Sequence, residues 1–188
     1  RLLPSVYDSK LIQQTLFNFI VEKDDYIMDF FSGSGSSAET TLALNAKAEG
    51  LNLKYILVQI PENIDKVLET AKDKAKKTAQ NAIKFLDSIG KPHTICEIGK
   101  ERIRRAGKKI KEESPLTTAD LDTGFRVFRL DEGNYEDVKR SPKEFKQDQL
   151  DLFLNNIKAD RNDLDLLFGC MLDWGVQLSL PMTQEVVD

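Results

Sequence analysis

The stretch that most constrains the fold is residues 26–44, which read YIMDFFSGSGSSAETTLAL. A short apolar run ends in an acid, Asp29, and is followed by a loop of glycines and serines and then by a helical pattern. Ser36 and Glu39 are three residues apart, which predicts a capping box at the start of that helix. A strand, a tight glycine turn and a capped helix in this order predict the first half of a nucleotide-binding βαβ unit.

The loop itself has the features of a ligand site. Glycine permits a left-handed backbone and allows a ligand to approach the bare main chain. The start of the next helix offers free N–H groups and the positive end of the helix dipole to polar or anionic groups. Residues 33–38 read GSGSSA and fit G-x-G-x-x-A, a form of the dinucleotide fingerprint, although a plain tight turn also fits this short pattern.

Composition limits the class of protein. The chain has 188 residues, of which 40% are hydrophobic and 31% charged, as in a soluble globular protein with one core and at most an appendage. No apolar run reaches membrane-spanning length, and we expect a cytoplasmic protein. Cys96 and Cys170 are far apart and predict no disulfide, and His93 has no metal-ligand cluster near it, so no metal site is predicted. Because the chain begins at Arg1 without a methionine, we expect a piece of a longer protein.

Periodicity predicts the other elements of the first half. Residues 9–22 form an amphipathic helix whose apolar stripe is expected to pack on the sheet; the stripe comprises Ile12, Leu16, Phe19 and Ile20. Residues 55–60 form a buried parallel strand. One long helix is predicted over 63–88, a third short strand over 94–98 and a basic helix over 99–113.

Two alternatives remain for the basic helix, which has seven basic and three acidic residues in its 15 positions. A charged run of this kind is most often a solvated face. The sharper hypothesis is contact with a nucleic-acid backbone through Arg102, Arg104, Arg105, Lys108 and Lys109, which would give affinity without sequence choice. Residues 1–115 carry 19 basic and 16 acidic groups, whereas 116–188 carry 8 and 15, so only the first part favours phosphate.

The second strand raises the question of a ribose contact. In nucleotide-binding folds this strand usually ends in an acid that binds the ribose hydroxyls. Here Gln59 stands at that position and Glu62 follows three residues later. Both side chains can hydrogen-bond a hydroxyl. For Glu62 a plain helix-start charge after Pro61 is an equal alternative.

A Pro/Thr/Asp-rich loop over 114–123 predicts a boundary, so we divide the chain into 1–115 and 116–188. In the second part, the alternation of residues 125–130 predicts a half-exposed strand, and two apolar patterns predict helices over 147–159 and 163–174. This small α+β appendage either completes the local core or docks another domain or chain.

Residues 29–35, DFFSGSG, resemble the D-x-F-x-G-x-G motif of amino-methylating DNA methyltransferases, where it forms the S-adenosyl-L-methionine (AdoMet) pocket. The resemblance implies that Asp29 holds the amino group of the cofactor's methionine part and that Gln59 or Glu62 holds the ribose. The residues that would wrap the cofactor with their backbone are Phe31, Ser32, Gly33, Ser34 and Gly35. Residues 10–12 are similar to the second half of that family's Lys-Pro-x-x-Leu motif, but Tyr7-Asp8 stands where Lys-Pro is expected.

The order of signals along nearly the whole chain resembles the C-terminal portion of the modification subunit of type III restriction–modification systems. The quoted segments are DFFSGSGSSAETTLALN, YILVQIPE, ICEIGKERIRRAGKKI, GFRVFRL and DWG. The resemblance implies a three-layer, Rossmann-like α/β methyltransferase fold, incomplete because upstream strands are absent. It also implies methylation of adenine N6 in double-stranded DNA by the full-length subunit, together with a restriction subunit and a second modification subunit.

The catalytic Asp-Pro-Pro-Tyr type motif of that family does not occur, because all six prolines are isolated. In that family the motif holds the flipped base. We therefore expect the isolated chain to be an inactive, AdoMet-binding fragment with no catalytic residue of its own. Two alternatives remain: an assembly or docking module with an idle cofactor site, and an NAD-dependent oxidoreductase domain.

Overall fold

The computed structural model describes residues 9–48, 50–136 and 156–185, without the side chains of residues 9–11. The chain divides into two compact units, Arg1–Gly124 and Phe125–Asp188. This division lies after Gly124, whereas the sequence predicted a boundary after residue 115. Residues 116–124 therefore pack with the first unit.

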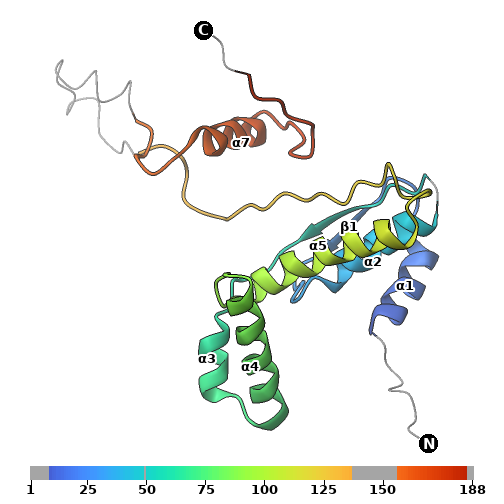
Figure 1. Cartoon of the computed structure of the whole chain (residues 1–188). Coiled ribbons are helices and arrows are strands. Elements are labelled where there is room, and N and C mark those ends of the chain that lie inside the picture. The colour runs from blue at the N-terminus through green and yellow to red at the C-terminus, as the bar shows by residue number, and fades with distance from the viewer. Residues whose placement is uncertain (1–8, 49, 137–155, 186–188) are drawn as a thin grey trace, which may run out of the picture. The chain divides into compact units, whose positions relative to one another are not determined.

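A parallel pair of strands, β1 (Tyr26–Asp29) and β2 (Lys54–Leu57), lies in the first unit. The first residue of each strand lies opposite the first of the other, and the last opposite the last. α2 (Ser36–Lys47) provides the crossover that parallel pairing requires (Figure 1). The βαβ unit predicted from residues 26–44 is confirmed, and the fold is α/β.

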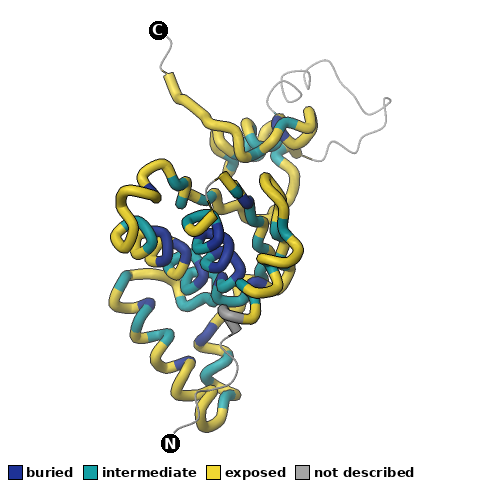
Figure 2. Tube along the Cα trace, turned by 90° about the vertical axis from the view of Figure 1, so that its right-hand side faces the viewer, coloured by how far each residue is buried: buried dark blue, intermediate teal, exposed yellow. Residues whose placement is uncertain are grey.

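Two helices pack on each other beside this sheet, α2 and α5 (Ile95–Glu113). Figure 2 shows their buried segments side by side. Leu42 of α2 is 2% exposed and Ile103 of α5 is 4% exposed. α2 also contacts both strands, so it joins the sheet to the helical layer.

The opposite face of the sheet is not covered by any described residue. Four alternating side chains of the strand segments are exposed by 44% to 53%: Tyr26, Met28, Ile56 and Val58. Parallel sheets are normally covered on both faces. Only two of the three expected layers are therefore formed by the described part of the chain.

α1 (Ser9–Ile20) packs on α2, but its orientation differs from the expected one. Gln13 lies 3.4 Å from the hydroxyl oxygens of both Ser36 and Thr40. The predicted apolar stripe of this helix is exposed, with Phe19 at 84%. The prediction that the stripe packs on the sheet is wrong, because α1 packs on α2 instead and turns the side that carries Gln13 toward it.

The single helix predicted over 63–88 is also wrong. The chain forms α3 (Ile64–Thr70) and α4 (Asp73–Ser88), with an extended residue, Ala71, between them. Asn63 caps α3 by accepting from the two N–H groups at 65 and 66. The break lets the helices pack on each other, which buries Ile64, Ala79 and Leu86 together. A continuous helix could not bring these residues together.

The third strand predicted over 94–98 is wrong as well. These residues, apart from Thr94, form the first turn of α5. Thr94 makes only an isolated bridge with Asn63. Ile98 packs against the buried residues of α3 and α4, and Ile103 is buried further along the same helix. The helical conformation of this segment therefore lets it contribute to both clusters.

In the second unit, α7 (Asp163–Asp173) confirms the helix predicted over 163–174 and begins with a capping box of Asn162 and Asp165. Residues 125–130 form no strand, and that prediction is wrong. This segment packs on α7 through Phe128, whose ring meets that of Phe168 edge-to-face with centroids 4.8 Å apart, while Leu130 is fully exposed. Of the helix predicted over 147–159, residues 147–155 lie outside the described part and the remainder is not helical.

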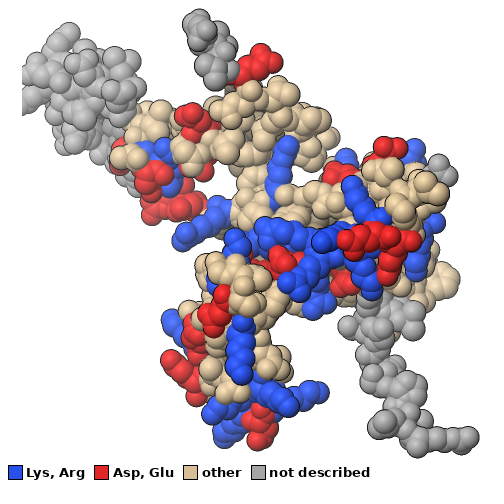
Figure 3. All heavy atoms as spheres, viewed as in Figure 1, with Lys and Arg blue, Asp and Glu red and all other residues tan. Residues whose placement is uncertain are grey.

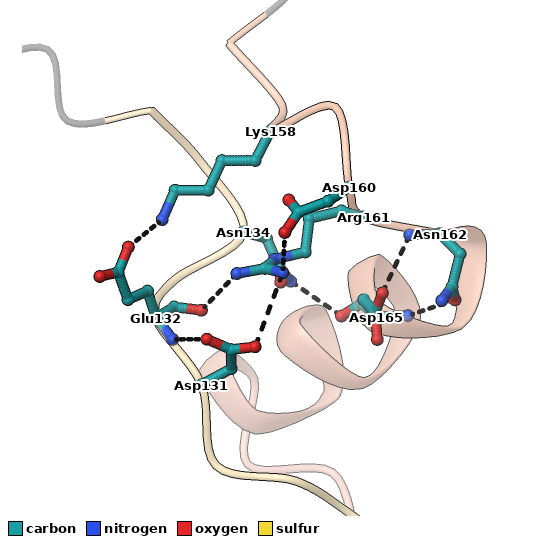
Figure 4. A network of polar contacts seen from close by, with 8 residues as sticks. All are labelled: Asp131, Glu132, Asn134, Lys158, Asp160, Arg161, Asn162 and Asp165. Atoms are coloured by element: carbon teal, nitrogen blue, oxygen red, sulfur yellow. Dashed lines mark hydrogen bonds and ion pairs between the residues drawn. The ribbon is translucent and has the colours of Figure 1, made fainter.

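A polar network fixes residues 131–134 to the start of α7 (Figure 4). The Arg161 side chain, 9% exposed, lies 3.1 Å from Asp160 and 3.9 Å from Asp131, and it donates to the Glu132 carbonyl at 3.2 Å. Lys158 pairs with the Glu132 carboxylate at 2.8 Å. This hydrogen bond is the main cause that lowers the pKa of Glu132.

His93 joins the α3–α4 hairpin to the turn before α5. Its Nδ1 lies 2.9 Å from Asp65 Oδ1, and its Nε2 lies 2.9 Å from Asp87 Oδ1. Only the imidazolium form carries protons on both nitrogens. The hydrogen bonds to Asp87 and then to Asp65 accordingly raise the pKa of His93 above 6.5.

We expect this clamp to make stability depend on pH. A raised folded pKa means that the contribution of His93 is complete below the unfolded pKa and is lost as pH rises through the folded pKa. Urea unfolding of the wild type and His93→Gln, from about pH 5.5 to about pH 8.5, should show a difference that shrinks as pH rises. Lys91→Gln is the control. A difference independent of pH would contradict the clamp.

Candidate functional site

The candidate site is the loop between β1 and α2. Gly33 has φ +51° and Gly35 has φ +78°, both in the left-handed region. Ser32 is buried; its N–H donates to the Val58 carbonyl at 3.3 Å, and its carbonyl accepts from the Gly35 N–H at 2.8 Å. The two glycines therefore allow a sharp turn that the second strand holds in place.

The helix start differs from the predicted capping box. The N-cap is Gly35, and no side chain caps the helix. Glu39 lies 3.4 Å from Arg102. The left-handed glycine already turns the chain into the helix, so Ser36 becomes its first residue. The N–H groups that an α-helix leaves free in its first turn have no side-chain cap here.

Asp29 ends β1 and ties the loop to the helix. Its Oδ1 accepts from the Phe31 N–H at 3.0 Å, and its Oδ2 accepts from the Ser37 hydroxyl at 2.5 Å. Each carboxylate oxygen can accept a further hydrogen bond. These two hydrogen bonds hold the Asp29 carboxylate beside the loop in one orientation.

The two candidates for the ribose contact have different surroundings. Gln59 Oε1 accepts from the Gly33 N–H at 2.7 Å, and its Nε2 donates to the Ile60 carbonyl at 3.1 Å. The side chain of Glu62 is exposed and makes no hydrogen bond or ion pair with any described residue. The structure therefore brings Gln59 to the glycine loop and leaves the Glu62 carboxylate free.

The remaining predicted site residues lie on the same loop. Phe31 is 91% exposed, so its ring stands in solvent, and Ser34 is half-buried at the crest. Tyr7 and Asp8 lie outside the described residues, as does the Lys10 side chain.

Sequence reasoning missed Gly99 as a part of this site. Gly99 lies within α5, directly beneath the loop: a Cβ on Gly35 would stand 3.3 Å from the Gly99 carbonyl oxygen. A Cβ on Gly99 would stand 3.5 Å from the Gly33 carbonyl oxygen. Glycine inside a helix is destabilising, and its presence in this pattern was the available signal.

The five basic residues proposed for nucleic-acid contact have acidic neighbours. Arg104 and Arg105 pair with Glu101 at 3.6 and 2.8 Å, and Arg102 pairs with Glu39. Lys108 and Lys109 pair with the acids four residues later. Figure 3 shows basic and acidic groups mixed in the central region of the first unit. Exposed ion pairs of this kind contribute little energy, so the pairing is compatible with both a solvated face and phosphate contact.

The described residues form neither a metal-binding cluster nor a membrane-spanning helix. No group of three or more His, Cys, Asp or Glu side chains is placed to hold a metal ion among them. No helix formed by these residues is long and apolar enough to cross a membrane.

Two curated proteins are similar to the chain. The Mod subunit of the type III restriction-modification enzyme StyLTI from Salmonella typhimurium is 34% identical over 115 residues, which are 61% of this chain and 15% of that protein. The EcoP15I Mod subunit from Escherichia coli is 32% identical over 123 residues, which are 64% of this chain and 14% of that protein. The resemblance to type III modification subunits is confirmed.

The chain spans about one seventh of the length of these type III modification subunits. No protein-family model and no solved structure matches it. The comparison therefore shows a similarity in sequence over about three fifths of this chain.

The close approach of the glycine loop to Gly99 makes the free energy of unfolding sensitive to a side chain at Gly35. Gly35→Ala adds a Cβ at positive φ and against the Gly99 carbonyl, and should lower the free energy of unfolding by about 2 to 3 kcal/mol. Gly90 has φ +62° and open space around its Cβ position. Gly90→Ala should therefore lower it by only about 1 kcal/mol. Equal losses in urea unfolding would mean that the close approach is absent.

Proposed function

We propose that the glycine loop binds AdoMet and that the chain is the cofactor-binding part of a type III modification subunit. The observation that carries the proposal is the geometry at the end of β1. A fixed carboxylate, two left-handed glycines and a helix start without a side-chain cap lie together there. Such a site offers an acceptor for an ammonium group and N–H donors for a carboxylate.

The residues present fit the two ends of this cofactor. Asp29 keeps acceptor capacity for the amino group of the methionine part. The free N–H groups in the first turn of α2 would receive its carboxylate, while the backbone of residues 31–35 would form the turn around it. For the ribose hydroxyls there are two candidates: Gln59, whose carboxamide already bonds Gly33 and Ile60, and Glu62, whose carboxylate has no partner among the described residues. When bound, AdoMet supplies the methyl group, and this chain's residues bind and orient it.

The full-length protein, in this proposal, is an adenine-N6 DNA methyltransferase that acts on double-stranded DNA. It assembles with a restriction subunit and a second modification subunit. The isolated chain transfers no methyl group, because it has no Asp-Pro-Pro-Tyr type motif to hold a flipped adenine. Methyl transfer to an adenine substrate by the chain alone would contradict this part of the proposal.

Exposed apolar side chains favour a second function that is compatible with the first. The uncovered sheet face and the α1 stripe lie in the first unit, and Trp174 in the second unit is 82% exposed. Such surfaces are typical of docking faces. A mass that rises with concentration, and does not rise after truncation at Gly124, would support an assembly role for the tail.

The test is a calorimetric titration with AdoMet, with NAD as the control ligand, because an NAD-dependent oxidoreductase domain was the other candidate. We expect AdoMet to bind and Gly33→Val to abolish binding, since a branched side chain is strained at φ +51°. Gly90→Val, at the end of α4, controls for the general cost of such a change. Binding of NAD alone would contradict the proposal, and binding of neither would favour the assembly role.

A further inference from the structure

We propose that Gln59 is a positioning residue, whose hydrogen bond to Gly33 holds the glycine loop in its binding shape. This inference rests on the proposed function, since it says how the AdoMet loop is kept ready.

The backbone around Gln59 is fixed before its side chain acts. The Val58 N–H donates to the Asp29 carbonyl at 2.8 Å, and the Val58 carbonyl accepts from the Ser32 N–H at 3.3 Å. The parallel pairing therefore continues one residue beyond β2. The Gln59 carbonyl also lies 3.7 Å from the Cys96 sulfur in the first turn of α5.

The carboxamide is then oriented by its own two ends. The nitrogen donates to the Ile60 carbonyl, which leaves the oxygen toward Gly33. Only the oxygen can accept from the Gly33 N–H, so a rotated amide would break both bonds. The Gln59 side chain thus connects the segment that follows β2 to Gly33 in the loop.

The loop needs this support because of its glycines. Gly33 and Gly35 populate many backbone conformations when nothing restrains them. Gly99 limits the loop from beneath, through van der Waals contact with its backbone. At Gly33, the Gln59 side chain adds a directional hydrogen bond. Together the two contacts select one loop conformation, which lowers the ordering cost when a ligand binds.

The first experiment measures hydrogen exchange of the Gly33 amide by NMR, without any ligand. In Gln59→Ala this amide should exchange on the order of fivefold faster, the value of one net hydrogen bond. In Gln59→Glu the carboxylate can still accept, so protection should return. The Leu42 amide, in the buried part of α2, reports whether each variant is folded. Unchanged exchange at Gly33 in a folded Gln59→Ala would overturn the proposal.

The second experiment separates positioning from ribose binding. Affinity is measured for AdoMet and for an analogue in which hydrogen replaces both ribose hydroxyls. Gln59→Ala should weaken both ligands by the same factor, on the order of fivefold. Glu62→Gln should weaken AdoMet and leave the analogue unchanged. A Gln59→Ala effect that disappears with the analogue would overturn the proposal.

The two experiments also separate this inference from the proposed function. A wild-type chain that binds neither AdoMet nor the analogue would contradict AdoMet binding by this chain. The exchange rate of the Gly33 amide would still decide whether Gln59 holds the loop.

Discussion

The parallel pairing of β1 with β2 is the interaction on which the candidate site depends. Parallel strands end at the same edge, so the pairing places the acid that ends β1 beside the residues that follow β2. Asp29 and Val58 are joined by a backbone hydrogen bond, and Gln59 then reaches Gly33. The crossing of the loop over Gly99 adds a second support from α5. The shape of the glycine loop therefore depends on the β1–β2 pair and on α5.

The order of strand, glycine loop and helix could be predicted because its signals are local. An apolar run and closely spaced glycines decide that segment by backbone preference alone. The predictions that failed depended on distant contacts. The break of the helix predicted over 63–88 follows from burial of Ile64 against Leu86, and the turn at 94–98 is helical because Ile98 packs on that core. The role of Gln59 could not be read from sequence, since Gly33 lies 26 residues away.

The uncovered sheet face and the exposed apolar stripe of α1 have the same explanation. Both are apolar patterns at regular spacing, and neither meets a described residue that would bury it. The residues that match this chain make up only about one seventh of each type III modification subunit. We interpret these faces as contacts of a larger assembly, in which the cofactor loop is one self-supported element.

Amide chemical-shift mapping during titration with AdoMet tests the central proposal most directly, because it reports where a ligand binds. The account predicts shifts at the loop and the first turn of α2, residues 31–38, with none from NAD at the same concentration. Residues of the second unit should not respond. Saturable shifts confined to that unit, or equal shifts of the loop with both ligands, would contradict the account.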